Sequence, residues 1–156
     1  MNNLNLIIAI ANKPDKTTNC SDSMKTKTEL RSLVNELVKS ALSSAIGRGS
    51  FIVNDIPADT FLEAEQNTIA LIFSKLLDNT INSSHNGCIR IAAIREDDYI
   101  TISVKDNNSD YSRYISGKMI KVTPLVKKIG GEINFEFHQR NSIKIVLNFI
   151  NREKAA

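Results

Sequence analysis

Hydrophobic residues recur at helical spacing in two long segments of the chain. The first segment has these residues on one face: Leu30, Leu33, Val34, Leu37, Val38, Ala41, Leu42, Ala45 and Ile46. Gly47 and Gly49 follow, which is typical of a helix C-terminus. The second segment runs from about Ala64 to Ser84, and its apolar stripe consists of Ile69, Ile72, Phe73, Leu76, Leu77, Thr80 and Ile81. A third helix is predicted from about Gly117 to Ile129 before Gly130-Gly131, and Pro124 is expected to kink or delay it, because proline lacks an amide donor.

Alternating hydrophobic and polar residues predict strands in the rest of the chain. Two strands, about Cys88 to Ile94 and Tyr99 to Lys105, are joined by a polar turn at 96–98. A closing hairpin alternates on each arm, with Ile133, Phe135 and Phe137 followed by Ile143, Ile145, Leu147 and Phe149. The apolar runs at Leu4–Ile10 and Phe51–Val53 each predict a short strand. The predicted fold class is α+β: a two-layer α/β sandwich with three main helices packed on one face of a mixed, largely antiparallel sheet.

The composition is that of one globular domain. The chain has 156 residues, 42% of them hydrophobic and 24% charged, which is ordinary for a domain with one core. We divide it into a strand and polar loop at 1–24, a domain at 25–150 and a polar tail at 151–156. The run Leu4–Ile10 is too short to cross a bilayer and lacks the positive flank of a signal peptide. We therefore expect a cytoplasmic protein with no membrane contact.

Charge, cysteines and histidines exclude several kinds of site. The net charge of +3 is too small to indicate binding to nucleic acid, which usually requires a concentrated basic face. Cys20 and Cys88 are far apart with no CxxC spacing, so neither a disulfide framework nor a zinc site is predicted. His85 and His138 have the context of surface residues, and no Ser/His/Asp or Cys/His arrangement can be made. No catalytic residue is assigned.

Asp106 departs from the pattern of its strand. Ile100, Ile102 and Val104 share one face, and a period of two places Asp106 on the same apolar face. A carboxyl group aimed at the helix layer requires a hydrogen-bond partner, because its burial without one is unfavourable. No adjacent residue supplies such a partner. Two interpretations follow: a carboxyl group that binds a ligand, or a strand-end aspartate that caps the next loop.

Asn79 is the second candidate. It lies at the margin of the apolar stripe of its helix, beside Lys75, Asn82 and Ser83. Its amide oxygen is a suitable ligand for a hard cation such as magnesium. An asparagine at such a margin is, however, more commonly a solvated residue.

Six stretches of the chain carry a family resemblance. They are TELRSLVNELV, DIPADTFLEAEQNTI, LLDNTINSS at 76–84, VKDNN at 104–108, MIKVTPLVKKIGGEI at 119–133 and SIKIVLNF at 142–149. In this order and spacing they resemble the ATP-binding domain of sensor histidine kinases, with LLDNTINSS as the asparagine box and VKDNN as the first glycine box. The resemblance covers about residues 28–150 and implies a Bergerat-like fold.

The resemblance also implies roles for the two anomalous residues. Asn79 takes the place of the magnesium-binding asparagine, and Asp106 that of the aspartate that hydrogen-bonds the adenine amino group. Asn108, Gly117 and Lys118 would line the same site, with ATP or ADP and magnesium as cofactors.

The chain departs from the family pattern mainly where phosphates would bind. Lys75 stands where the family often has an asparagine, and related ATPases a glutamate acting as general base. Asn108 and Asp110 replace glycines of the first glycine box, whose lack of a side chain lets the backbone approach a ligand. Gly117 is out of register with the second glycine box, and only residues 107–115 stand in place of a long lid. Lys118 and its basic neighbours at 113 and 121 either compensate in part or form a solvated helix face.

Together these features predict a two-component-type signalling module with a degenerate nucleotide site that binds ATP or ADP with magnesium weakly or not at all. Its expected partner is a signalling protein: a kinase, a response regulator or a sigma-factor regulator. A homodimer is left open. The alternatives are a functional ATP-binding domain of a sensor histidine kinase and a small anti-sigma-type serine kinase, although Lys75 counts against the latter. Either would transfer the ATP γ-phosphate to a histidine or serine of a partner. A phosphotransfer adaptor is a further alternative, but its histidine-bearing helical hairpin is not found in this sequence.

Overall fold

The described part of the chain, residues 26–110, 121–138 and 141–151 of a computed structural model, is built on one five-stranded sheet. Its strands are β2 (Phe51–Asp55), β4 (Cys88–Glu96), β5 (Tyr99–Asp106), β6 (Gly131–His138) and β7 (Ser142–Ile150), in the order β2-β4-β5-β7-β6. β2 pairs with β4 in parallel, and the other neighbours are antiparallel. β1 (Lys27–Glu29) and β3 (Phe61–Glu63) form a separate antiparallel pair.

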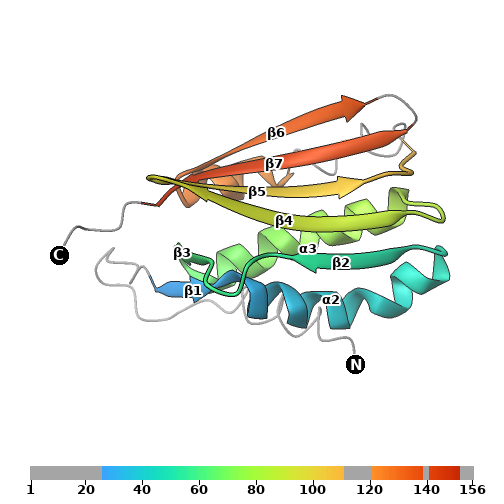
Figure 1. Cartoon of the computed structure of the whole chain (residues 1–156), viewed down its shortest axis with the longest axis horizontal. Coiled ribbons are helices and arrows are strands. Elements are labelled where there is room, and N and C mark those ends of the chain that lie inside the picture. Colours follow the sequence, from blue (N-terminus) through green and yellow to red (C-terminus); the bar gives the residue numbers. More distant parts are fainter. Residues whose placement is uncertain (1–25, 111–120, 139–140, 152–156) are drawn as a thin grey trace.

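Three helices of the described chain pack on one face of this sheet. They are α2 (Leu30–Gly47), α3 (Gln66–Ser83) and α5 (Thr123–Lys128). Figure 1 shows α3 behind the strands and α2 alongside β2. The predicted α+β sandwich, with a mixed and largely antiparallel sheet, is confirmed. None of the helices in these residues combines the length and apolar character needed to cross a membrane.

The start of α2 is fixed by a side-chain cap. The Glu29 carboxylate accepts hydrogen bonds from the backbone N–H groups of Arg31 at 3.1 Å and Ser32 at 2.9 Å, which would otherwise lack partners in the first turn. Hydrogen bonding with Ser32, and then with Arg31, lowers the pKa of Glu29. At the other end, Gly49 has a φ of 66°, a backbone conformation that favours glycine after a helix.

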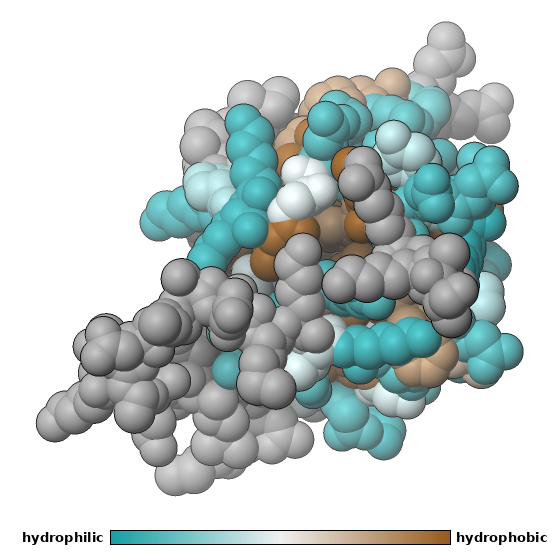
Figure 2. Space-filling view, turned by 90° about the vertical axis from the view of Figure 1, so that its left-hand side faces the viewer, coloured by the Kyte–Doolittle hydropathy of each residue, from teal (hydrophilic) through white to brown (hydrophobic). Residues whose placement is uncertain are grey.

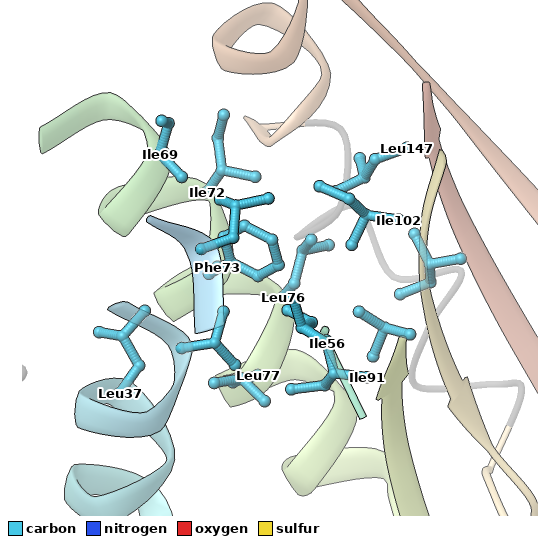
Figure 3. Close-up of a cluster of buried hydrophobic side chains, with 14 of the residues drawn as sticks. Leu37, Ile56, Ile69, Ile72, Phe73, Leu76, Leu77, Ile91, Ile102 and Leu147 are labelled. Carbon is cyan, nitrogen blue, oxygen red and sulfur yellow. The ribbon is translucent and has the colours of Figure 1, made fainter. Parts of the chain in front are cut away.

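The core lies between α3 and the inner face of the sheet. The stripe predicted for the second helix is entirely buried: Ile69, Ile72, Phe73, Leu76, Leu77, Thr80 and Ile81. In Figure 3, Ile72, Phe73 and Leu76 of this stripe lie across from the sheet residues Ile91 of β4, Ile102 of β5 and Leu147 of β7. α2 adds the buried residues Leu30, Val34, Leu37, Ala41 and Ala45. The hydrophobic pattern therefore places α3 in the centre of the domain.

Leu42 and Ile46 do not join this core, although the sequence pattern places them on the apolar face of α2. Their side chains are 48% and 64% exposed. The apolar residues of α2 cover a wider arc than its neighbours can bury, and these two lie on the uncovered side. The hydrophobic pattern thus predicts the apolar face of α2 but not how far that face is buried.

The third helix is shorter in the described residues than the sequence predicts. α5 begins at Thr123, and Pro124 lies in its first turn, where a missing amide donor removes no hydrogen bond. Pro124 thus delays the helix and does not kink it. The expected start of the helix at 117–120, like the strand predicted at Leu4–Ile10, lies outside the described residues.

The end of the molecule at the left of Figure 1 carries the turn between β4 and β5 and the end of β7. Figure 2 views this end: its described surface is mainly hydrophilic, and hydrophobic side chains are visible near the centre. Tyr99 and Ile150, which pair across β5 and β7, are both about half exposed. The candidate site described below lies at the opposite end of β5.

Candidate functional site

Asp106 is the last residue of β5 and faces the helix layer, as the alternation of its strand predicts. It pairs in register with Ile89 of β4 and Ile143 of β7, both fully buried. Its own side chain is 0% exposed. A polar group so placed needs internal partners or a ligand.

Three donors of the chain itself hold the Asp106 carboxyl group. Oδ1 accepts the Ser84 hydroxyl at 3.2 Å and the backbone N–H of Asn108 at 3.2 Å, and Oδ2 accepts the Ser109 hydroxyl at 2.5 Å. The expectation that no adjacent residue supplies a partner is therefore wrong, because Ser84 comes from the end of α3 and Ser109 from a loop that folds back. The carboxyl group caps this loop, which is the second interpretation of its place in the pattern.

The hydrogen bonds continue into a buried network of four residues. The Ser84 hydroxyl lies 2.8 Å from the Ser50 hydroxyl, and the backbone N–H of Gly87 donates to Ser50 Oγ at 3.1 Å. Ser50, Ser84, Asp106 and Ser109 are each less than 5% exposed; we call them the serine–aspartate network. It joins the end of α2, the end of α3, β5 and the loop after β5 at one point.

The loop at 107–110 is bound to the end of α3 by its backbone. Ser109 forms an isolated β-bridge with Ser84, and Asp110 N donates to Ser83 O at 2.8 Å. Ser109 N donates to Asn141 O at 2.7 Å, which ties the same loop to the start of β7. The loop therefore lies directly over the Asp106 carboxyl group.

Asn108, a predicted nucleotide-binding residue, serves this loop as well. His85 N donates to Asn108 O at 3.1 Å, and the Asn108 side-chain amide donates to His85 O. Asn107 contributes its Oδ1, which accepts from Cys88 N at 2.8 Å. Asp106 and Asn108 are thus brought together, but by contacts within the protein.

Gly87 is required for the close approach of β4 to the network. A Cβ atom at this position would lie 2.6 Å from Ser84 Oγ and 2.7 Å from Asp106 Oδ1. Any side chain would displace one of these groups. The preceding Asn86 has a φ of 47°, so the chain turns sharply just before β4.

Asn79 lies half-buried on α3, one turn before Ser83. The Ser83 hydroxyl donates to the backbone oxygen of Asn79 at 3.0 Å. Lys75 is four residues earlier on the same side of the helix, so its ammonium group opposes a divalent cation at Asn79. Burial raises the pKa of the neighbouring Asp78, and the positive charge of Lys75 partly offsets this. In the residues that the structure describes, no group of three or more His, Cys, Asp and Glu side chains could hold a metal ion.

Solved structures with the same architecture include histidine kinases. The histidine kinase AdeS from Acinetobacter baumannii aligns with a TM-score of 0.72 at 13% identity, over 82% of this chain and 68% of that one. The catalytic domain of histidine kinase ThkA aligns with a TM-score of 0.70 at 16% identity, over 81% of this chain and 95% of that one. This chain has the histidine-kinase ATP-binding fold.

The sequence comparisons add nothing to this fold assignment. No protein-family model matches the chain, and no curated protein matches it.

A third structure, ThkA in complex with the response regulator TrrA, aligns with a TM-score of 0.67 at 19% identity, over 83% of this chain and 43% of that one. At such identities the likeness establishes the histidine-kinase fold and not the activity.

The remaining residues considered from the sequence are Gly117, three basic residues and two histidines. Gly117 and Lys118, like Arg113, lie outside the described residues. Lys121 is described and exposed, two residues before α5. The histidines are exposed, as predicted: His85 follows α3, and His138 Nε2 lies 3.5 Å from Glu136 Oε2 on the outer face of β6.

Among the described residues, Asp106 is bonded within the chain and Asn79 lies on α3 beside a basic residue, Lys75. The Asp106 side chain is 0% exposed and accepts three hydrogen bonds from the chain, out of about four that a carboxylate can accept. A magnesium ion at Asn79 would lie on the same side of α3 as the Lys75 ammonium group. Sequence reasoning missed Ser50, Ser84 and Ser109, since isolated serines in polar segments give no signal of a shared network.

Proposed function

We propose that this domain is a signalling module of the two-component type that binds ATP or ADP with magnesium weakly or not at all. It acts through contacts with another signalling protein. The observation that supports this most is the state of Asp106, whose buried carboxyl group is held by Ser84, Asn108 and Ser109. The carboxyl group that would bind the adenine amino group is thus buried and bonded to three donors of its own chain.

Binding of adenine at Asp106 would cost the free energy of breaking a contact of its carboxyl group. Because Asp106 is 0% exposed under the loop at 107–110, an adenine amino group would reach it by moving this loop and its contacts, such as the Ser109 hydroxyl 2.5 Å from Oδ2. Loss of one buried hydrogen bond costs about 1–3 kcal/mol. This lowers nucleotide affinity by roughly ten- to hundredfold.

A response regulator is the first partner to test. The structure of ThkA was solved in complex with the response regulator TrrA, which supports a partner of this class for a chain with the same fold. A kinase or a sigma-factor regulator would be tested in the same binding assay.

Calorimetric titration with ADP and magnesium, ATP and magnesium, and adenosine tests the nucleotide part of the proposal. We expect no saturable heat at millimolar ligand, whereas the ThkA catalytic domain serves as a parallel sample with the intact fold. Micromolar binding that is lost in Asp106→Asn, but kept in the exposed control Asp98→Asn, would refute the proposal.

The alternative is a functional ATP-binding domain of a kinase, and the retention of Asn79 and Asp106 at their positions favours it. This alternative predicts transfer of the γ-phosphate. We expect no acid-labile label on the chain, or on an added response regulator, after incubation with γ-labelled ATP. Stoichiometric labelling would establish the kinase.

A further inference from the structure

An apolar surface lies uncovered where α2 runs beside β2. Leu42 and Ile46, one turn apart on α2, are 48% and 64% exposed, and Phe51 at the start of β2 is 59% exposed. Val38 continues the same row by a further turn and is half-buried. We call Val38, Leu42, Ile46 and Phe51, together with the free side of β2, the α2–β2 surface. Figure 1 shows the two elements side by side.

The helix and the strand of this surface are held together by a polar contact. The Asn54 side-chain amide donates to Asn35 Oδ1 at 2.8 Å and to Arg31 O at 3.2 Å. α2 is therefore fixed along β2, and the row of apolar residues on α2 keeps its place relative to the edge of the sheet.

β2 is an edge strand without the usual protection. Among the described residues it pairs only with β4, so one side of its backbone has no strand partner. Exposed edges in soluble proteins are commonly protected by charged side chains. The other edge, β6, carries Glu132 and Glu136, whereas the one charge of β2, Asp55, is paired with Arg90 of β4. An apolar edge beside an apolar helix row is a surface that favours an added strand.

We propose that residues Leu4–Ile10 of the same chain add to β2 as a sixth strand and cover the α2–β2 surface. As a strand, this segment has Leu4, Leu6, Ile8 and Ile10 on one face and Ile7 on the other. Asn54 of β2 contacts α2, so the alternation of the strand places Phe51, three residues earlier, on the opposite face of the sheet. An added strand with apolar residues on both faces therefore suits this edge.

The intervening chain is long enough for this arrangement. Residues 11–25 separate the segment from Thr26, and such a length reaches about 50 Å when extended. α2 has 18 residues and is therefore about 27 Å long. A tethered segment has an effective concentration in the millimolar range. This favours the segment over a second copy of the chain as the occupant.

Amide hydrogen exchange of β2 tests the proposal, with two pairs of variants. Leu42→Asp/Ile46→Asp places charges on the surface, and Ser43→Asp/Ser44→Asp, at exposed positions of the same turns, is the matched control. Exchange in peptides covering 51–55 is measured in the full chain and in a variant lacking residues 2–11.

We expect the Leu42→Asp/Ile46→Asp pair to accelerate exchange in β2 by about tenfold or more, because opening of an edge strand exposes its amides. The control pair should leave it unchanged. In the variant lacking residues 2–11, exchange should already be fast, and the same charges should add nothing. Equal acceleration by these charges with and without residues 2–11 would overturn the proposal.

Two further measurements cover a shortened chain that does not fold and a surface that is buried by a second copy of the chain. If the shortened chain does not fold, Ile7→Asp/Ile8→Asp is compared with Thr17→Asp/Thr18→Asp in the polar linker, and only the first pair should accelerate exchange in β2. Sedimentation should show a monomer. A dimer that dissociates in Leu42→Asp/Ile46→Asp, yet persists without residues 2–11, would assign the surface to a second copy and overturn the proposal.

Discussion

Replacement of Asp106 by alanine removes the acceptor that joins α3, β5 and the loop at 107–110. In a domain whose aspartate has no internal hydrogen-bond partner and bonds only a ligand, this change would lower ligand affinity. It would leave the stability of the free protein nearly unchanged. Here the carboxyl group has internal donors. The change should therefore destabilise the protein with no nucleotide present.

The size of the effect follows from the three donors. The Ser84 hydroxyl keeps a second partner, the Ser50 hydroxyl at 2.8 Å. The Ser109 hydroxyl, 2% exposed, loses its acceptor in the interior, and the Asn108 amide loses its acceptor at a more exposed position. At about 1–3 kcal/mol for an unsatisfied buried donor, we expect Asp106→Ala to lower the free energy of unfolding by about 2–4 kcal/mol.

Asp106→Asn should fall between wild type and Asp106→Ala, by about 1 kcal/mol, because its Oδ1 still accepts from Ser84 and Asn108. Ser109→Ala removes the same hydrogen bond from the other side and should match it. Urea unfolding followed by circular dichroism in nucleotide-free buffer measures these differences. The matched control is Asp98→Ala, in the exposed turn between β4 and β5.

The test is the ranking of these variants by their free energy of unfolding. If Asp106→Ala and Asp98→Ala both unfold within about 0.5 kcal/mol of wild type, the internal donors do not hold the carboxyl group. Asp106 would then be available to a ligand, which would contradict the proposed function.

Three other regions give shorter tests. Gly87→Val should destabilise by about 1–3 kcal/mol, since even a Cβ atom there lies 2.6 Å from Ser84 Oγ; an unchanged melting temperature would contradict this. Phe73→Ala and Leu76→Ala should each cost about 2–5 kcal/mol, because both side chains lie in the core at no more than 1% exposure. Glu29 has a lowered pKa, so its cap stabilises α2 above the ordinary value of 4.5 and is lost as the pH falls through the folded pKa. Glu29→Gln should therefore unfold more easily than wild type at neutral pH and equally easily in acid.

The hydrophobic pattern predicts those elements that bury a long, regular set of side chains. α3 carries seven apolar or small residues over its stripe, and all are buried. The phase of β5 likewise places Asp106 on the inner face before any contact is known. β1 and β3 are not predicted, because strands of three residues contain too little alternation to be distinguished from a loop.

The partners of Asp106 and the exposure of Leu42 depend on contacts between distant segments. Ser84 precedes Asp106 by 22 residues, and nothing in the polar stretch around it indicates that its hydroxyl points at a carboxyl group. Leu42 fits the apolar face of α2 as well as Leu37 does, yet only Leu37 is buried. A periodic pattern shows which residues share a face, but the neighbouring elements decide how much of that face is covered.

The serine–aspartate network has a consequence for how such a domain would respond to the state of the cell. Its donors and acceptor belong to one chain, so their local concentration is fixed and does not follow the level of any metabolite. A site that closes on a nucleotide registers the ratio of ATP to ADP around it. If the site binds nucleotide weakly or not at all, as proposed, the contacts of Ser84 and Ser109 would keep the same shape in energy-rich and energy-depleted cells. Partners of this domain would then meet one constant surface, insulated from adenylate metabolism.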